Sequence, residues 1–94
     1  MLFVVAGRFK PGAETQRDAI QGQFSEHLMQ RGDRVHFGGP LYGEDGARLG
    51  VLLLVEAPSF AEAKAFLLAS PYQQAGLYET VEVSEIRAEV GALR

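Results

Sequence analysis

The sequence predicts a single α+β domain whose elements follow the order β-α-β-β-α-β, with two helices covering one face of a four-stranded antiparallel sheet. This is the ferredoxin-like arrangement. Three observations lead to it. The 94 residues are enough for one domain, 1–94, and no more. Hydrophobic residues switch between strand and helix periodicity in this order. The segment 49–55 is apolar at nearly every position, which favours a strand covered on both faces.

The first half of the chain begins with a strand and a helix. Residues 2–6 are an apolar, β-branched run typical of a strand, and the Lys10-Pro11-Gly12 turn follows it. The next segment, 13–31, predicts a helix that stops at Gly32. Its apolar stripe recurs at four-residue spacing, with His27 on the flank, and consists of Ile20, Phe24 and Leu28.

A short second strand is predicted over 33–37. Because strand side chains alternate, we expect Val35 and Phe37 on one face and Arg34 and His36 on the other. The Gly38-Gly39-Pro40 segment is expected to end this strand, and it could lie at the mouth of a cleft.

The second half of the chain adds a hairpin, a helix and a last strand. Asp45-Gly46 is typical of a hairpin tip before the strand at 49–55. Ser59 and Glu62 form a capping-box pattern that predicts a helix to about Ala69. We expect its inward side chains, with Phe66 on the flank, to be Phe60, Ala63 and Leu67. Residues 80–85 predict the last strand, and Ile86, out of phase, indicates a bulge or the strand end nearby.

The apolar strand at 49–55 also predicts how the chain assembles. Two helices can cover one face of the sheet, but a chain of this length has too few helices for both. The bare face is most economically covered by a second copy of the same sheet. We therefore expect a homodimer through the sheet face, which would make a dimeric α/β barrel.

Composition and charge exclude several classes of function. The formal net charge is −3, which gives no basic footprint for nucleic acid. The chain has no cysteine, and its two histidines have no ligand-like spacing, so we expect no metal and no other cofactor. No segment is long and apolar enough to cross a membrane or to act as a secretion signal, and a soluble cytoplasmic protein is the expectation.

Acid–base chemistry is the remaining kind of catalysis that the sequence favours. His36 is the first candidate, because imidazole titrates near neutral pH. Arg34 shares its side of the predicted strand. A hydrogen-bonded or surface histidine is the structural alternative for His36, and packing beside the core is the usual outcome for a histidine such as His27.

Three segments carry a resemblance to a known family. They are Gly38-Gly39-Pro40-Leu41, the helix start at 59–63, and Ser70-Pro71-Tyr72 with the Ala75-Gly76-Leu77-Tyr78 that follows. On these motifs the sequence resembles the YciI-like, or YCII-related, family. The resemblance covers the whole length of the chain. The resemblance implies a ferredoxin-like subunit that forms a dimeric α/β barrel. It also implies a cleft in which Ser70, Tyr72 and Gly39 are candidate lining residues beside His36.

The family's proposed active site is a His–Asp pair, and the resemblance does not carry it over. The family histidine lies on the first helix, where this chain has Ile20 and Gln21, and His27 comes two helical turns later. The aspartate of the family's Asp-Pro is Ser70 here.

Three hypotheses follow from these departures. In the first, the chain transforms a small cyclic or aromatic metabolite by cofactor-free acid–base chemistry, with His36 and Ser70 as catalytic candidates and Arg34, Tyr72 and Gly39 as ligand-binding candidates. In the second, the catalytic pair is lost and a non-catalytic small-molecule-binding or accessory role remains. In the third, the chain is an assembly module.

Overall fold

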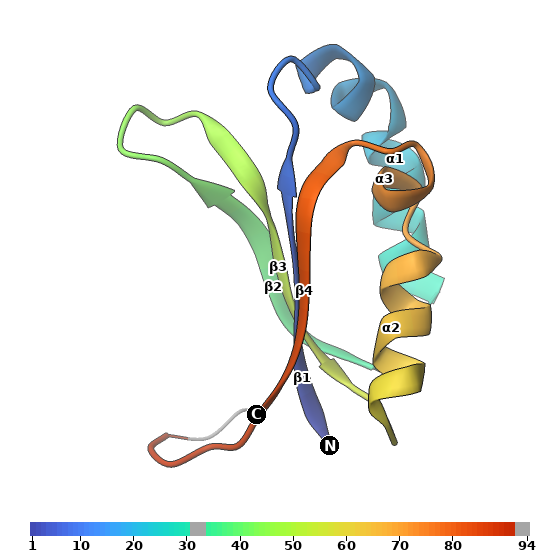
Figure 1. Ribbon diagram of the computed structural model, residues 1–94, viewed down its shortest axis with the longest axis vertical. Helices are drawn as coiled ribbons and strands as arrows, with labels where there is room; N and C mark the ends of the chain where they lie inside the picture. The colour runs from blue at the N-terminus through green and yellow to red at the C-terminus, as the bar shows by residue number, and fades with distance from the viewer. Residues whose placement is uncertain (31–33, 92–94) are drawn as a thin grey trace.

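The computed structural model describes residues 1–30 and 34–91, and it confirms the predicted α+β fold (Figure 1). All strand pairs are antiparallel, and the sheet order is β2-β3-β1-β4. The helices lie on one side of the sheet (Figure 1). The elements are β1 (Leu2–Phe9), α1 (Glu14–Gln30), β2 (Val35–Tyr42), β3 (Arg48–Glu56), α2 (Phe60–Leu68), α3 (Pro71–Gln74) and β4 (Tyr78–Ile86).

The hydrophobic core lies between the sheet and the helices. Phe3 and Val5 of β1 are buried there, together with Val51, Leu53 and Val55 of β3. The α1 stripe is as predicted: Phe24 is buried, and Ile20 and Leu28 pack against the core. No helix among the described residues is long and apolar enough to cross a bilayer.

The second strand differs from its prediction because it contains a β-bulge. Val35 pairs with Val55, but Phe37 pairs with Leu54, so His36 is an extra residue between two normal pairs. Val35 therefore packs against the core, while Phe37 lies on the opposite face and is 63% exposed. The prediction that both share one face was wrong, since it assumed unbroken alternation.

The glycine-rich segment continues the second strand instead of ending it. Gly38, Gly39 and Pro40 all pair with residues of β3. Pro40 is tolerated because β2 is an edge strand, where a missing N–H breaks no second ladder. The predicted start of this strand at Asp33 and the helix stop at Gly32 lie outside the described residues.

The second helix begins at its predicted cap. The Ser59 hydroxyl accepts a hydrogen bond from the Glu62 backbone N–H at 3.2 Å. Its buried side chains are Ala63, Phe66 and Leu67. Phe66 is thus inward and not on the flank, whereas Phe60 is partly exposed and meets Phe3 edge to face.

The last strand, Tyr78–Ile86, is longer than predicted, and the strand end expected near Ile86 is confirmed. Ile86 pairs with Leu2, on the face turned away from the helices. Ile86 is out of phase with Val83 because its side chain points to that face, and not because of a bulge. The register shift in this strand pair lies instead between Arg8 and Phe9 of β1.

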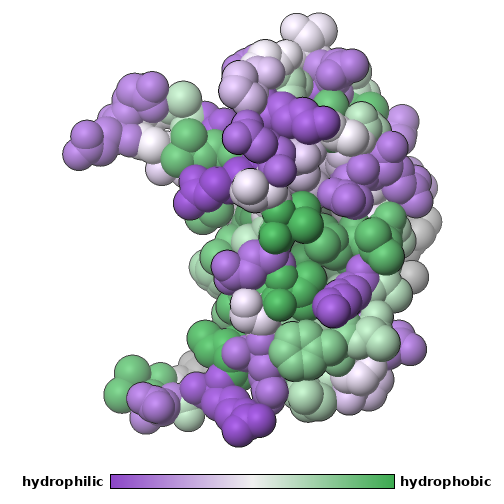
Figure 2. Space-filling view, viewed as in Figure 1, coloured by the Kyte–Doolittle hydropathy of each residue, from purple (hydrophilic) through white to green (hydrophobic). Residues whose placement is uncertain are grey.

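The sheet face away from the helices, which we call the open face, carries many apolar side chains, with polar ones such as Glu82 and Ser84 along β4. The residues on this face are identified from the strand register, because the alternate residues of β1 and β3 point to the core. The side of the molecule that carries it is hollowed between the β2–β3 hairpin and the C-terminal segment (Figure 2). Its apolar residues are Leu2, Val4, Ala6, Phe37, Leu41, Leu52, Leu54 and Ile86.

Candidate functional site

A groove of about 320 Å³ lies between α1 and the β2–β3 half of the sheet. This volume falls within the usual range for a small-molecule site. Most of its lining side chains are apolar or aromatic, and a few are polar. The lining residues that matter most below are Gln21, Phe24, Ser25, Gly39, Tyr42 and Arg48.

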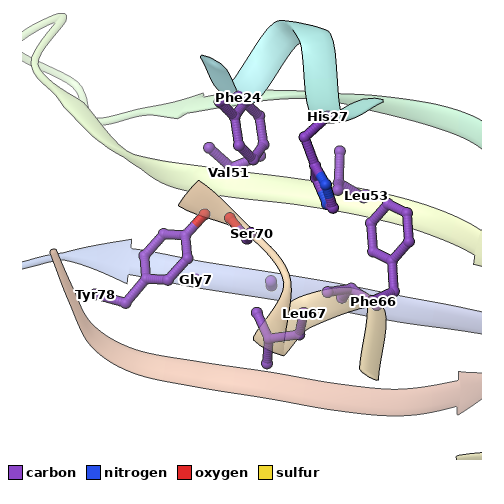
Figure 3. Close-up of a pocket in the computed structure, with 11 residues that line it drawn as sticks. Gly7, Phe24, His27, Val51, Leu53, Phe66, Leu67, Ser70 and Tyr78 are labelled. Atoms are coloured by element: carbon purple, nitrogen blue, oxygen red, sulfur yellow. The ribbon is translucent and has the colours of Figure 1, made fainter. Parts of the chain in front are cut away.

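A much smaller pocket adjoins the groove deeper in the core (Figure 3). The two cavities share Phe24, Val51 and Leu53 in their walls. The deeper pocket has a volume of about 10 Å³, which is room for one water molecule. Its polar lining comes from His27, Ser70 and Tyr78. We call it the buried pocket.

Ser70 and Tyr78 meet at one end of the buried pocket. Ser70 is 4% exposed, and its hydroxyl lies beside the Tyr78 hydroxyl, although not in ideal hydrogen-bond geometry (Figure 3). Burial raises the pKa of Tyr78 from 10.0 to about 12, and the contact with Ser70 offsets only part of this rise. The phenol therefore stays neutral across the physiological range and acts as a hydrogen-bond donor or acceptor.

Gly7 explains how Tyr78 reaches this position. A Cβ atom at Gly7 would lie 2.5 Å from Cε1 of the Tyr78 ring, so the ring rests directly on the bare backbone of β1. Phe9 also stacks on the Tyr78 ring, with centroids 5.5 Å apart. A glycine in a central strand thus marks a close approach that aims a hydroxyl at the pocket.

His27 reaches the buried pocket from α1. Its ring lies 5.1 Å from the Phe66 ring of α2, centroid to centroid. Figure 3 shows the imidazole pointing down from the helix toward the sheet. Because His27 follows Ile20 by two helical turns, both residues share the inward side of the helix. Of the two histidines, His27 is therefore the one that lines the buried pocket.

Tyr72 lies in the core behind the groove. It is fully buried, and its ring stacks on Phe24 with centroids 4.4 Å apart. Burial raises the pKa of its hydroxyl, while the nearby charges of Arg48 and Arg17 pull in the opposite direction. Tyr72 thus supports the groove wall through Phe24 and places its hydroxyl near Arg48.

The other residues predicted from the sequence lie in different places. Gly39 lines the groove, and Ser70 lines the buried pocket. His36 Nε2 lies 3.2 Å from Glu56 Oε2, and Arg34 pairs with Glu62 at 3.9 Å; neither is among the residues that line the two cavities. The catalytic and binding roles of these residues stay predictions.

Sequence reasoning passed over two polar residues of the groove. Ile20 stands where the family pattern has its histidine, and the next residue, Gln21, lines the groove. Arg48 lines it too, and the available signal was a cation directly before an apolar strand. Among the described residues, no group of three or more histidine, aspartate or glutamate side chains is close enough to hold a metal ion.

Comparisons with known proteins place the chain in a family. The model of the YCII-related domain matches residues 1–87. Among solved structures, the chain is similar to 5-chloro-2-hydroxyhydroquinone dehydrochlorinase (TftG) from Burkholderia phenoliruptrix AC1100, solved in complex with 2,5-dihydroxybenzoquinone. The TM-score is 0.85 and the identity 26%, over 93% of this chain and 94% of that one. No protein among the curated ones matches. The chain belongs to the YCII-related domain family.

Proposed function

We propose that this chain binds a small cyclic or aromatic metabolite in the groove between α1 and the sheet. The observation that carries the proposal is the groove itself, with about 320 Å³ of space and apolar walls interrupted by Gln21, Ser25 and Arg48. The similarity to a dehydrochlorinase solved with 2,5-dihydroxybenzoquinone supports an aromatic or quinonoid ligand class.

The chemistry proposed for this ligand is acid–base catalysis without a cofactor. His27 is the titratable imidazole nearest to it, because it lines the buried pocket that shares three wall residues with the groove. Ser70 and Tyr78 would hold a water molecule or a ligand oxygen beside it. His36 remains the second candidate base, from its place in the sequence.

A non-catalytic binding role is the second candidate function, and one observation favours it. Ile20 stands at the place of the family histidine, with the amide of Gln21 next to it in the groove lining, and Ser70 replaces the family aspartate. An amide and a hydroxyl can hold a ligand but cannot accept its proton at neutral pH.

A panel of phenols, hydroxyquinones and lactones tests binding through thermal stability of the protein. Ser25 is exposed on α1 and lines the groove, so Ser25→Trp should fill it and abolish the stabilisation. Gln23→Trp is the matched control, because Gln23 is exposed on the same helix and is absent from the groove lining. If no compound stabilises the unmodified protein, or if both tryptophan variants respond alike, the groove is not the binding site.

Turnover of the compounds that bind separates the two candidate functions. Catalysis through the buried pocket predicts that His27→Ala lowers kcat strongly while the compound still binds. If only His36→Ala lost activity, His36 and not His27 would be the base. Binding without any turnover in the unmodified protein would favour the non-catalytic role.

We also propose that two copies pair through their open faces. The support is the row of apolar side chains on that face, of which Phe37 is 63% and Ile86 42% exposed. A face of this kind on a small domain is a typical interface. Light scattering after gel filtration should give a dimer, and Leu54→Lys should give a monomer. Leu68→Lys on the exposed side of α2 is the control and should remain dimeric.

A further inference from the structure

Arg48 occupies an unusual place at the end of the groove. It is the first residue of β3 and pairs with Tyr42 of β2 just after a register shift. A second hollow of about 260 Å³ lies on its other side, lined also by Phe9, Arg17 and Glu79. Arg48 is the one lining residue that the groove and this hollow share. Its half-buried side chain therefore separates the two spaces.

Within the described part of the chain, the charge of Arg48 has no carboxylate partner, and its polar contact is with the Tyr72 hydroxyl. Its Nε is buried and makes no hydrogen bond there, and no described carboxylate lies within 4.0 Å of its guanidinium. Glu14 and Glu79 line the second hollow without pairing with it. A buried donor without a hydrogen bond lowers the stability of the folded protein, so natural proteins seldom keep one without a reason.

The surroundings of Arg48 suit an anionic oxygen. The Tyr72 hydroxyl, also buried and without a hydrogen bond of good geometry among the described residues, lies near the guanidinium. Among the described residues, no aspartate or glutamate lines the groove. Phe24, Tyr42 and Val51 offer flat or apolar surface to the rest of a ligand. A guanidinium with its fixed fork of donors binds carboxylates and similar oxyanions well.

We propose that Arg48 is the anion-recognising residue of the groove, and that the ligand is an aromatic or cyclic compound carrying one negatively charged oxygen, as a carboxylate or a phenolate. This inference rests on the proposed function, because it takes the groove as the binding site. Tyr72 acts as a positioning residue that holds the guanidinium toward the groove.

Paired ligands that differ only in charge test the inference by NMR titration of the full chain. The probes are benzoate against neutral benzamide, and 4-nitrophenol above and below its own pKa. We expect the unmodified protein to bind an anionic form more tightly than its neutral counterpart. The benzoate pair reports on a carboxylate ligand and the nitrophenol pair on a phenolate.

Arg48→Met should weaken binding of the preferred anion by roughly 10- to 100-fold and leave the neutral probe unchanged. Arg87→Met, at an exposed arginine on the far end of the chain, is the matched control and should bind like the unmodified protein. Arg48→Met should also unfold at the same temperature or a higher one without ligand, since it removes an unpaired buried donor.

The outcomes separate the two proposals. If neutral and anionic forms bind equally and Ser25→Trp abolishes both, the groove is the binding site but Arg48 does not recognise charge. If no probe binds the unmodified protein, the proposed function fails and this inference with it. A large loss of thermal stability in Arg48→Met would make Arg48 a structural residue and overturn the inference.

Discussion

Replacing Gly7 by alanine tests the packing that aims Tyr78 at the buried pocket. The new methyl carbon would lie 2.5, 2.6 and 2.7 Å from three carbons of the Tyr78 ring. Ordinary carbon contacts are about 3.5–4.0 Å, so the ring must move by about 1 Å. That shift would disturb the stack of Phe9 on the Tyr78 ring, whose centroids are 5.5 Å apart. Overpacking of this kind costs about 1–3 kcal/mol.

Urea denaturation followed by circular dichroism measures this cost. Gly7→Ala should lower the free energy of unfolding by about 1–3 kcal/mol. In a Tyr78→Ala background the same change should cost far less, because the clashing ring is absent. Gly22→Ala is the matched control; nothing lies near its Cβ in α1, so it should stabilise by about 1 kcal/mol. An equal loss for Gly7→Ala with and without the Tyr78 ring would refute the argument.

Three further predictions concern pH, a helix cap and a turn. The pKa of Tyr78 is raised to about 12 by folding, so the native state holds this proton more tightly than the unfolded chain. The resulting stability is complete below pH 10 and should fall by about 1–3 kcal/mol as pH rises toward 12; urea titrations of Tyr78→Phe should lack this fall. Ser59→Ala removes the acceptor for the Glu62 N–H and should cost about 1 kcal/mol by thermal unfolding, whereas Ser59→Asp should cost little. Gly46 has φ +81, so Gly46→Ala should lower the urea midpoint by strain equivalent to about 1 kcal/mol; an unchanged midpoint would show that the turn relaxes.

The sequence predicted the order of elements because each element carries a local signal. The stripe of α1, the Ser59 cap and the Asp45-Gly46 turn all depend on residues close together in the chain, and all three are present. In the turn, Asp45 Oδ1 accepts a hydrogen bond from the Ala47 N–H at 2.9 Å. Local chemistry of this kind needs no knowledge of the tertiary fold.

The candidate site was harder to predict because it depends on register. The bulge at His36 reverses which side chains of β2 face the helices, and alternation alone cannot reveal it. Arg48 was passed over for a related reason. The third strand was expected to begin at Leu49, whereas pairing with Tyr42 starts it one residue earlier and places Arg48 at the groove.

Ser70 was predicted from the family resemblance, and it does line a cavity. Its neighbours there could not have been predicted from spacing. His27 arrives from α1, and Tyr78 arrives across a bare glycine of β1. The buried pocket is assembled from segments distant in sequence, so only the tertiary fold brings them together.

The extra residue in β2 has a consequence for how this chain could diverge. This residue reverses the alternation of side chains between the two faces of β2, so residues before and after it follow opposite patterns. Loss of a single residue there would turn the groove-facing side chains on one flank of β2 outward, or its open-face side chains inward. Relatives that differ in length at this point would therefore be expected to differ in both surfaces at once.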